Sequence, residues 1–417
     1  MSTSPPRAGR GRASGRRVRV SRRAAFWFVA AAFAVTMVGT TLPTPLYVLY
    51  QREMGFSTLM TTVVFATYAV GVLAALLLFG RLSDAIGRRR TLLPGLACAL
   101  LSAVVFLAAH DLTLLLLGRL LSGLSAGIFT GTATAALVDL ADDDAGERAT
   151  LVSTVANMGG LGTGPLLAGV LAQTTAAPLI TPFAVHLVLL VLAAAGIWLI
   201  PETVTTVGRP RLSFARPTVP RRMRGTFTRS ATAGFAGFAV LGLFTSVAPA
   251  FLGRLLHLSS PALAGAVVFT LFAASALGQI VLVRILGRTA LPVGCAMLIA
   301  GMGILAAALA AGSLALLLTA AVVAGLGQGT GFRAGLASLN AQAPADQRAA
   351  VASTYFLVLY IAISLPVTGV GLSADAFGLR DTGMAFSAAV ALLALSVLLT
   401  LLPSRRRSPS RHRSPSR

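Results

Sequence analysis

The stretch Gly80–Arg90 reads GRLSDAIGRRR and lies where one apolar run, residues 58–81, ends and before the next, residues 91–109, begins. Each run is close to the roughly 20 residues that a helix needs to cross a membrane. Val72–Phe79 is continuously apolar, whereas the strands of a membrane β-barrel alternate apolar and polar residues. The stretch is therefore predicted to form a short charged turn between two membrane-spanning helices.

The whole chain has the composition of a membrane protein. Of its 417 residues, 56% are hydrophobic and 11% are charged, which leaves too little polar surface to cover a soluble globule of this size. The apolar runs predict an all-α membrane protein with twelve transmembrane helices. The predicted spans are residues 25–50, 58–81, 91–109, 112–138, 149–172, 181–200, 230–252, 261–285, 290–311, 313–339, 349–373 and 382–402.

The formal net charge is +22, and each of the 34 basic residues is Arg. In a soluble protein this charge would suggest nucleic acid, but the arginines gather beside the apolar runs, so the lipid bilayer is the expected partner and nucleic acid is not. Twenty-nine arginines fall on one side of the predicted membrane, and Arg52, Arg254 and Arg380 fall on the other. The positive-inside rule then predicts a bacterial cytoplasmic-membrane protein with both termini in the cytoplasm.

The chain also repeats itself at an offset of 200 residues. Residues 141–154 align without gaps with residues 341–354, and Gly87-Arg88 aligns with Gly287-Arg288. Such a duplication predicts two homologous six-helix halves, as in transporters whose central site lies between the halves. The expected division is a basic disordered arm (1–24), the N-terminal half (25–201), a basic linker (202–229), the C-terminal half (230–403) and a basic tail (404–417).

The charged turn resembles the signature Gly-x-Leu-Ser-Asp-x-x-Gly-Arg-Arg of the major facilitator superfamily. The residues that match it and form the expected conformational switch are Gly80, Asp84, Gly87, Arg88 and Arg89; Ala85 departs from the family, which often has a basic residue there. The resemblance implies that the carboxylate holds arginines in one state of the transport cycle and releases them in another. In the second half Arg284 stands at the position equivalent to Asp84, so that copy of the signature is degenerate.

Arg119 lies inside the fourth predicted span, roughly 12 Å from its outer end at about 1.5 Å per residue. Its surroundings resemble a second signature of drug and proton antiporters, with Ser122 in place of the usual Gln. The resemblance implies that Arg119 faces a central cavity and takes part in coupling. The alternative is an Arg that extends to the outer interface or binds backbone carbonyls.

The fifth span carries a run of small residues around a proline: Gly160, Gly164, Pro165 and Gly169. Small residues four apart allow two helices to touch along their backbones, and proline loosens the helix there. The run also resembles the antiporter motif of the superfamily, which implies export.

Six further residues inside predicted spans are candidates to line a cavity or to form interhelical contacts. They are Thr41, Asn157, Phe244, Gln328, Tyr355 and Tyr360. No Asp or Glu lies in the middle of any predicted span, so the residue that would carry a proton is not evident from the sequence.

The expected function is therefore a secondary transporter, a proton-coupled exporter of small amphipathic compounds or drugs that works by alternating access. An uptake permease for a metabolite is the alternative. A membrane-bound enzyme is disfavoured because the four His residues lie at span edges and in the tail, with no catalytic motif around them. No cofactor or metal site is expected, and the protein is expected to act as a monomer.

Overall fold

The computed structural model describes residues 20–79, 82–142, 146–203, 218–344 and 347–401, and every regular element within these ranges is helical. The first helices are α1 (Arg22–Thr41), α2 (Tyr47–Met54), α3 (Thr58–Phe79), α4 (Leu82–Ile86), α5 (Arg88–Leu107), α6 (Leu112–Leu140), α7 (Gly146–Thr174) and α8 (Thr181–Leu199). They are followed by α9 (Arg224–Leu255), α10 (Pro261–Leu277), α11 (Val283–Leu286), α12 (Ala290–Ala311), α13 (Leu314–Gln342), α14 (Arg348–Phe377) and α15 (Leu379–Leu401).

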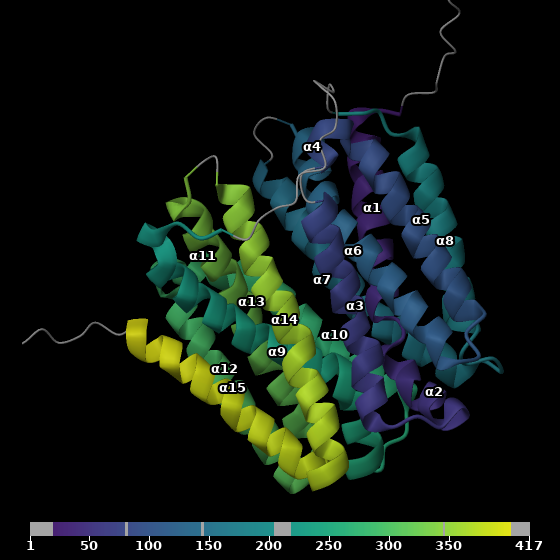
Figure 1. Cartoon of the computed structure of the whole chain (residues 1–417), viewed down its shortest axis with the longest axis vertical. Coiled ribbons are helices and arrows are strands. Elements are labelled where there is room, and N and C mark those ends of the chain that lie inside the picture. The colour runs from purple at the N-terminus through teal and green to yellow at the C-terminus, as the bar shows by residue number, and fades with distance from the viewer. Residues whose placement is uncertain (1–19, 80–81, 143–145, 204–217, 345–346, 402–417) are drawn as a thin grey trace, which may run out of the picture.

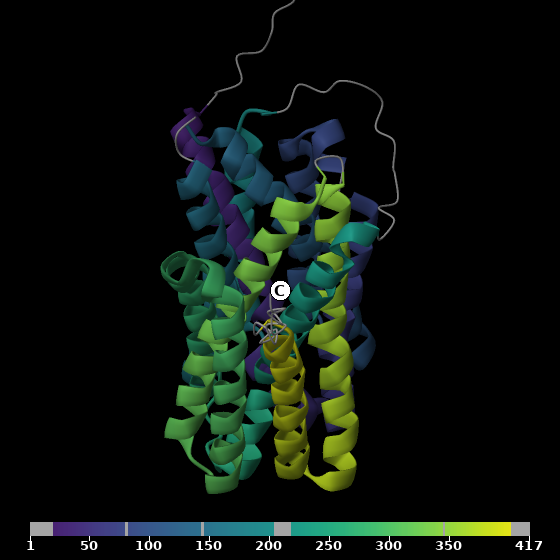
Figure 2. The same ribbon diagram turned by 90° about the vertical axis from the view of Figure 1, so that its left-hand side faces the viewer.

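The helices form two bundles that lie side by side. Helices α1 to α8 form the first bundle, which begins in purple in Figure 1, and α9 to α15 form the second, which runs from teal through green to yellow. The view turned by 90° shows that the long helices of both bundles run in broadly the same direction (Figure 2). Between the bundles, α7 packs against α10 and α3 packs against α14.

The expected membrane fold is confirmed. Eleven continuous helical segments of the described chain are long and apolar enough to cross a membrane. One of them, Pro261–Ala311, has 51 residues and turns at Gly287, whose φ of 49° is a left-handed value that favours glycine. It therefore supplies two of the twelve predicted spans.

The first predicted span, residues 25–50, is not one straight helix. Helix α1 ends at Thr41, a single 3₁₀ turn follows at Thr44–Leu46, and α2 begins at Tyr47. Pro43 and Pro45 cause this break because proline has no backbone N–H to continue the helical ladder.

Several helices begin where a side chain satisfies the free N–H groups of the first turn. The Oδ1 atom of Asp111 accepts a hydrogen bond of 2.9 Å from the Leu114 N–H at the start of α6. Ser21, Ser260 and Ser313 cap α1, α10 and α13 in the same way. These short polar residues before apolar runs set the helix boundaries.

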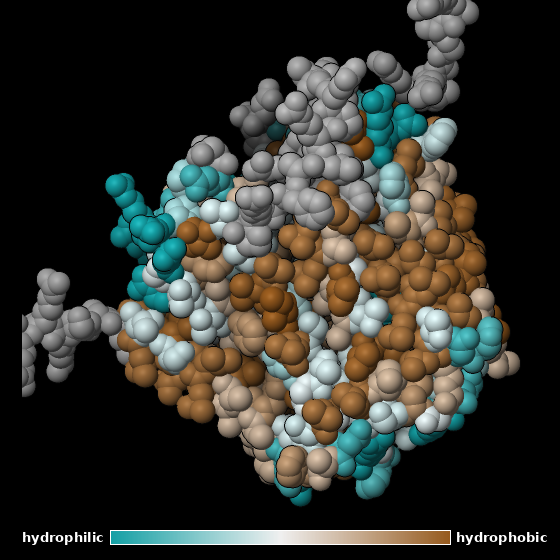
Figure 3. Space-filling model, viewed as in Figure 1, coloured by the Kyte–Doolittle hydropathy of each residue, from teal (hydrophilic) through white to brown (hydrophobic). Residues whose placement is uncertain are grey.

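The outer surface is apolar in a broad zone between two polar ends. Figure 3 shows this zone, with hydrophilic residues gathered near the two ends. Large apolar side chains such as Leu192 and Leu392 are more than 60% exposed, which a soluble protein would avoid. We call the end that carries Arg22, Arg88 and Arg284 the basic end, and the end that carries Asp111 and Arg254 the opposite end.

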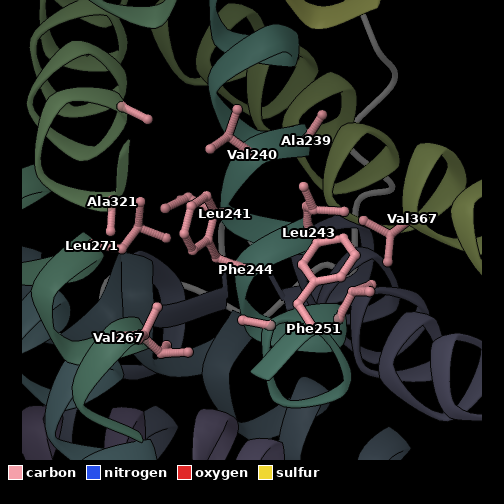
Figure 4. Packing of buried hydrophobic residues seen from close by; sticks show 14 of the residues in the cluster. Ala239, Val240, Leu241, Leu243, Phe244, Phe251, Val267, Leu271, Ala321 and Val367 are labelled. Carbon is pink, nitrogen blue, oxygen red and sulfur yellow. The ribbon is translucent and has the colours of Figure 1, made fainter. Parts of the chain in front are cut away.

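The interior of the second bundle is tightly filled. Phe244 of α9 lies among Leu241, Val267, Leu271 and Ala321, from α9, α10 and α13 (Figure 4). Its exposure is 2%. Phe244 is thus part of the hydrophobic core in this conformation.

Small residues of α7 allow close approach to α1. A Cβ atom placed on Gly164 would overlap the Val38 carbonyl oxygen, and one on Gly160 would overlap the Ala34 carbonyl oxygen. Gly159 of the same helix has open space around it. Backbone-to-backbone contact of this kind is a main source of helix association in membranes.

We expect Gly164→Val to destabilise the protein, since the new side chain has to push α7 away from α1, at a cost of about 1–3 kcal/mol. Thermal unfolding of the purified protein in detergent measures this effect. Gly159→Val is the matched control because it makes the same change in helix propensity without a clash. Equal melting temperatures for the two variants would contradict the packing argument.

Candidate functional site

The charged turn connects α3 to α5 through the short helix α4. Gly80 lies outside the described residues, and for Asp84 the structure describes only the backbone, within α4. Gly87 separates α4 from α5 with a φ of 109°, and a Cβ atom there would overlap the Glu202 carboxylate. The backbone conformation therefore favours glycine at this position, and any larger residue would also have to displace the Glu202 carboxylate.

Arg88 joins this turn to the basic end of α6. Its Nε atom lies 2.9 Å from an Asp139 carboxylate oxygen, and its Nη1 atom donates to the Ser83 hydroxyl at 2.7 Å. Arg22 of α1 donates to the Asp139 and Ala141 carbonyls at the same helix end. Cations at a helix C-terminus are favourable because the exposed carbonyls are partly negative.

Glu202, which the sequence interpretation did not select, holds the other side of the turn. Its two carboxylate oxygens each accept a 3.4 Å hydrogen bond, from the N–H groups of Arg89 and Arg90. These groups belong to the first turn of α5, where a negative charge is stabilising. The Arg89 guanidinium lies over the Trp198 ring at 5.3 Å. Glu202 directly follows the sixth predicted span and is on the same predicted side of the membrane as the turn. This position could have suggested that it contacts the turn.

The second copy of the signature has a contact of its own. Arg284 of α11, at the position equivalent to Asp84, forms an ion pair with Glu147 at the start of α7. The pair connects the two bundles at the basic end. Both side chains are largely exposed, so the pair adds little stability. The second-half signature is degenerate in sequence, but its Arg284 still lies where the two bundles meet.

Arg119 of α6 is buried, with 1% of its surface exposed. It donates to the Thr40 carbonyl at 2.5 Å and, weakly, to the Phe65 carbonyl at 3.5 Å. Its guanidinium lies 4.9 Å from the centre of the Tyr68 ring and 5.6 Å from that of Phe65. Among the described residues its Nε atom has no hydrogen-bond partner. The side chain therefore does not extend to the outer interface, and backbone carbonyls and aromatic faces surround its charge.

The aromatic wall beside Arg119 reaches the second bundle. Tyr68 of α3 contacts Tyr360 of α14, with ring centres 6.4 Å apart. We call Arg119, Phe65, Tyr68 and Tyr360 the Arg119 cluster. The structure thus brings together two predicted residues, Arg119 and Tyr360. It adds Phe65 and Tyr68, which the sequence interpretation missed because aromatic residues in apolar spans are ordinary.

Gln328 belongs to a separate polar group inside the second bundle. Its Oε1 atom accepts from the Ser275 hydroxyl at 2.6 Å, and the Gln279 amide donates to that same hydroxyl at 3.3 Å. Ser275 also contacts the Met158 sulfur of α7, next to the half-buried Asn157. Through the contact between Ser275 and Met158, this polar group reaches the α7–α10 junction between the bundles.

Tyr355 lies apart from both groups. Its ring is stacked on Phe332 with centres 6.2 Å apart, and it belongs to a hydrophobic cluster with Leu339, Val351 and Leu359. Its hydroxyl is buried without a partner among the described residues.

The small-residue run of α7 contacts helices of both bundles. Gly160 and Gly164 face α1, while Pro165 and Gly169 face α10, where glycine again allows backbone contact. Pro165 has no N–H for the Leu161 carbonyl four residues earlier. The Thr41 hydroxyl donates to that carbonyl at 2.7 Å, so the predicted residues Thr41 and Pro165 are complementary.

His186, which the sequence interpretation placed at a span edge, is 3% exposed and lies between α8 and α1. Its Nε2 atom is 3.0 Å from the Val35 carbonyl oxygen. Because a carbonyl only accepts, Nε2 is the donor in this bond and Nδ1 remains an acceptor. The residues that line a small cavity beside the ring include Thr36, Ser102, Ser122 and Ser125. Within the described ranges no three His, Cys, Asp or Glu residues are grouped to bind a metal.

We expect Glu202→Gln to lower stability by about 0.5–2 kcal/mol, because the amide loses the negative charge that complements the first turn of α5. Thermal unfolding in detergent at low ionic strength measures the loss. Glu53→Gln is the control, since Glu53 is exposed on α2 at the opposite end. Equal melting temperatures for both variants would show that Glu202 does not hold the turn.

Comparisons with known proteins agree with this architecture. The family model described as Major Facilitator Superfamily matches residues 24–365. The Multidrug resistance protein MdtL of Escherichia coli (strain K12 / DH10B) is 38% identical over 81 residues, which is 19% of this chain and 21% of that protein.

Solved structures share the fold over nearly the whole chain. The human organic anion transporter MFSD10 (TETRAN) aligns with a TM-score of 0.67 and 18% identity, covering 91% of this chain and all of that one. An inward-facing, unoccupied bacterial homologue of the human lysosomal transporter Spinster aligns with a TM-score of 0.70 and 17% identity, covering 91% and 96%. Two laterally paired helical bundles, the charged turn and the family match over most of the sequence together place this chain in the Major Facilitator Superfamily of membrane transporters.

Proposed function

We propose that this transporter is a proton-coupled exporter of small amphipathic compounds that works by alternating access. The observation that carries the proposal is the small-residue run of α7, which contacts α1 of its own bundle and α10 of the other. A helix that packs closely on both sides can transmit a change of angle between the bundles. The partial similarity to a multidrug resistance protein supports export.

The bundles move against each other through contacts that form and break at the two ends. At the basic end the contact is the Arg284–Glu147 ion pair. At the opposite end the Arg254 guanidinium donates to the Thr58 hydroxyl at 3.1 Å. Asp84, Arg88 and Arg89 form the switch beside the basic end, where breaking and remaking charge-assisted bonds selects one state.

Coupling needs a group that gains and loses a proton, and arginine does not. Within the described ranges each acidic residue lies at a helix end or in a connection between long helices. We assign the proton to His186, whose Nε2 atom donates to the Val35 carbonyl and whose ring lines a small cavity together with Thr36, Ser102, Ser122 and Ser125. The described residues lining this cavity include no other titratable or charged group. A charge on His186 would therefore act on the adjacent α6, which carries Arg119.

We place the basic end in the cytoplasm, which puts both termini and the linker 202–229 there as well. The arginine distribution supports this orientation. The homologous halves are residues 25–201 and 230–403, and the working unit is a monomer with its substrate path between the two halves.

The proposed function is tested in proteoliposomes loaded with a panel of lipophilic drugs. We expect a pH gradient that drives protons inward across the protein to accelerate drug export severalfold, and we expect His186→Gln to remove this dependence while downhill exchange continues. A wild-type flux that ignores the gradient would contradict proton coupling. Gradient-dependent flux by folded His186→Gln would contradict only the assignment of His186.

Reporter fusions test the orientation. We expect alkaline phosphatase to be inactive when fused after residue 210 or at the C-terminus, because these segments carry arginines that stay on the cytoplasmic side. A fusion between α5 and α6, after His110, is the matched control and should be active. Phosphatase activity of the fusion after residue 210 would contradict the proposed topology.

A further inference from the structure

We propose that Arg119 binds the anionic group of the exported compound, so that the substrates of this transporter are amphipathic monoanions with an aromatic or otherwise apolar body. The proposal rests on the exporter function stated above and names its substrate class. Four observations on the Arg119 cluster carry it.

The first observation is a buried charge without a counter-ion. Arg119 is 1% exposed, and none of the ion pairs among the described residues includes it. Its partners are the neutral carbonyls of Thr40 and Phe65, and the second of these bonds is long. A permanently charged guanidinium in a low-dielectric interior is costly until an anion approaches it.

The second observation is unused donor capacity. The Nε–H group of Arg119 has no acceptor among the described residues, and neither has the buried hydroxyl of Tyr47. Tyr47, at the start of α2, belongs to the same hydrophobic cluster as Phe65, whose ring lies 5.6 Å from the Arg119 guanidinium. Carboxylate, sulfonate and phosphate oxygens accept hydrogen bonds from donors of these two kinds.

The third observation is the position of the cluster. Tyr68, whose ring lies under the guanidinium, also contacts Tyr360 of the second bundle. The cluster therefore lies where α3 meets α14, at the junction that separates when one bundle rotates against the other. Separation of the two tyrosines would open the aromatic faces of Phe65 and Tyr68 to the apolar body of a ligand.

The fourth observation is the position of the acidic residues. The acidic residues that the structure describes lie at helix ends or in connections between long helices, so the described part of the membrane interior offers no carboxylate for a cationic compound. A fixed positive charge on the substrate would instead be repelled by Arg119. The charge of Arg119 would thus make the site prefer anionic over cationic substrates.

The test compares three ligands with one ring system: 2-naphthoate, the neutral 2-naphthamide and the cationic 2-naphthylmethylammonium. Binding of radiolabelled 2-naphthoate to the purified full-length protein is measured directly, and the other two compounds serve as competitors. We expect the anion to bind at least tenfold more tightly than the amide, and the ammonium compound not to compete.

Variants assign the effect to one residue. Arg119→Gln should weaken naphthoate binding at least tenfold and remove the preference for naphthoate over the amide. Arg119→Lys should keep part of this preference, because lysine retains the positive charge but lacks the planar, bidentate guanidinium. Arg333→Gln on α13 is the matched control and should bind as wild type does. Thermal unfolding confirms that each variant is folded, and the charge preference of the wild type tests the proposal even if Arg119→Gln does not fold.

Equal affinity of the wild type for anion and amide, or unchanged binding by folded Arg119→Gln, would overturn the proposal and leave only a structural arginine. These outcomes are distinct from a failure of the exporter function. Gradient-driven export without an anion preference would retain the function and reject the anion site. An anion preference in a protein that ignores the gradient would reject proton coupling and retain the site.

Discussion

The structure depends on one constraint: inside the membrane, polar backbone groups and charges find their partners within the protein because lipid offers none. Helices meet this constraint because they pair their own N–H and C=O groups. Where a backbone group has no helical partner, a side chain can bond to it instead. At Pro165 the Leu161 carbonyl loses its helical partner, and the Thr41 hydroxyl of α1 replaces it. Pro165 therefore loosens α7 and also leaves a carbonyl free to bond α7 to α1.

The same constraint gives small residues their importance. Apolar side chains are as well solvated by lipid as by protein, so helices associate through close packing rather than by avoiding water. Glycines of α7 allow contact with α1 on one side and with α10 on the other. The α7–α10 contact joins the two bundles, so the packing that stabilises the fold also lies where alternating access requires movement.

Most charged residues lie at helix ends. The contacts that they form there position neighbouring helices. Asp139 receives Arg88, and Glu202 receives the first N–H groups of α5. Arg119 is buried in the interior of α6, and no ion pair among the described residues includes it. A cation kept in the interior without a counter-ion is the feature of this protein that most requires a functional reason.

The sequence by itself determined the membrane class, the twelve spans and the charged turn, because helix length and the exclusion of charge from lipid are local properties of the chain. It also indicated that Arg119 is unusual, from its depth in the span. Only the tertiary structure decided that Arg119 lies against Tyr68, that Tyr68 meets Tyr360, that Glu202 caps α5, and that Phe244 belongs to the core. These contacts join residues far apart in the chain, and an apolar span shows no amphipathic pattern that would reveal which of its faces meets which neighbour.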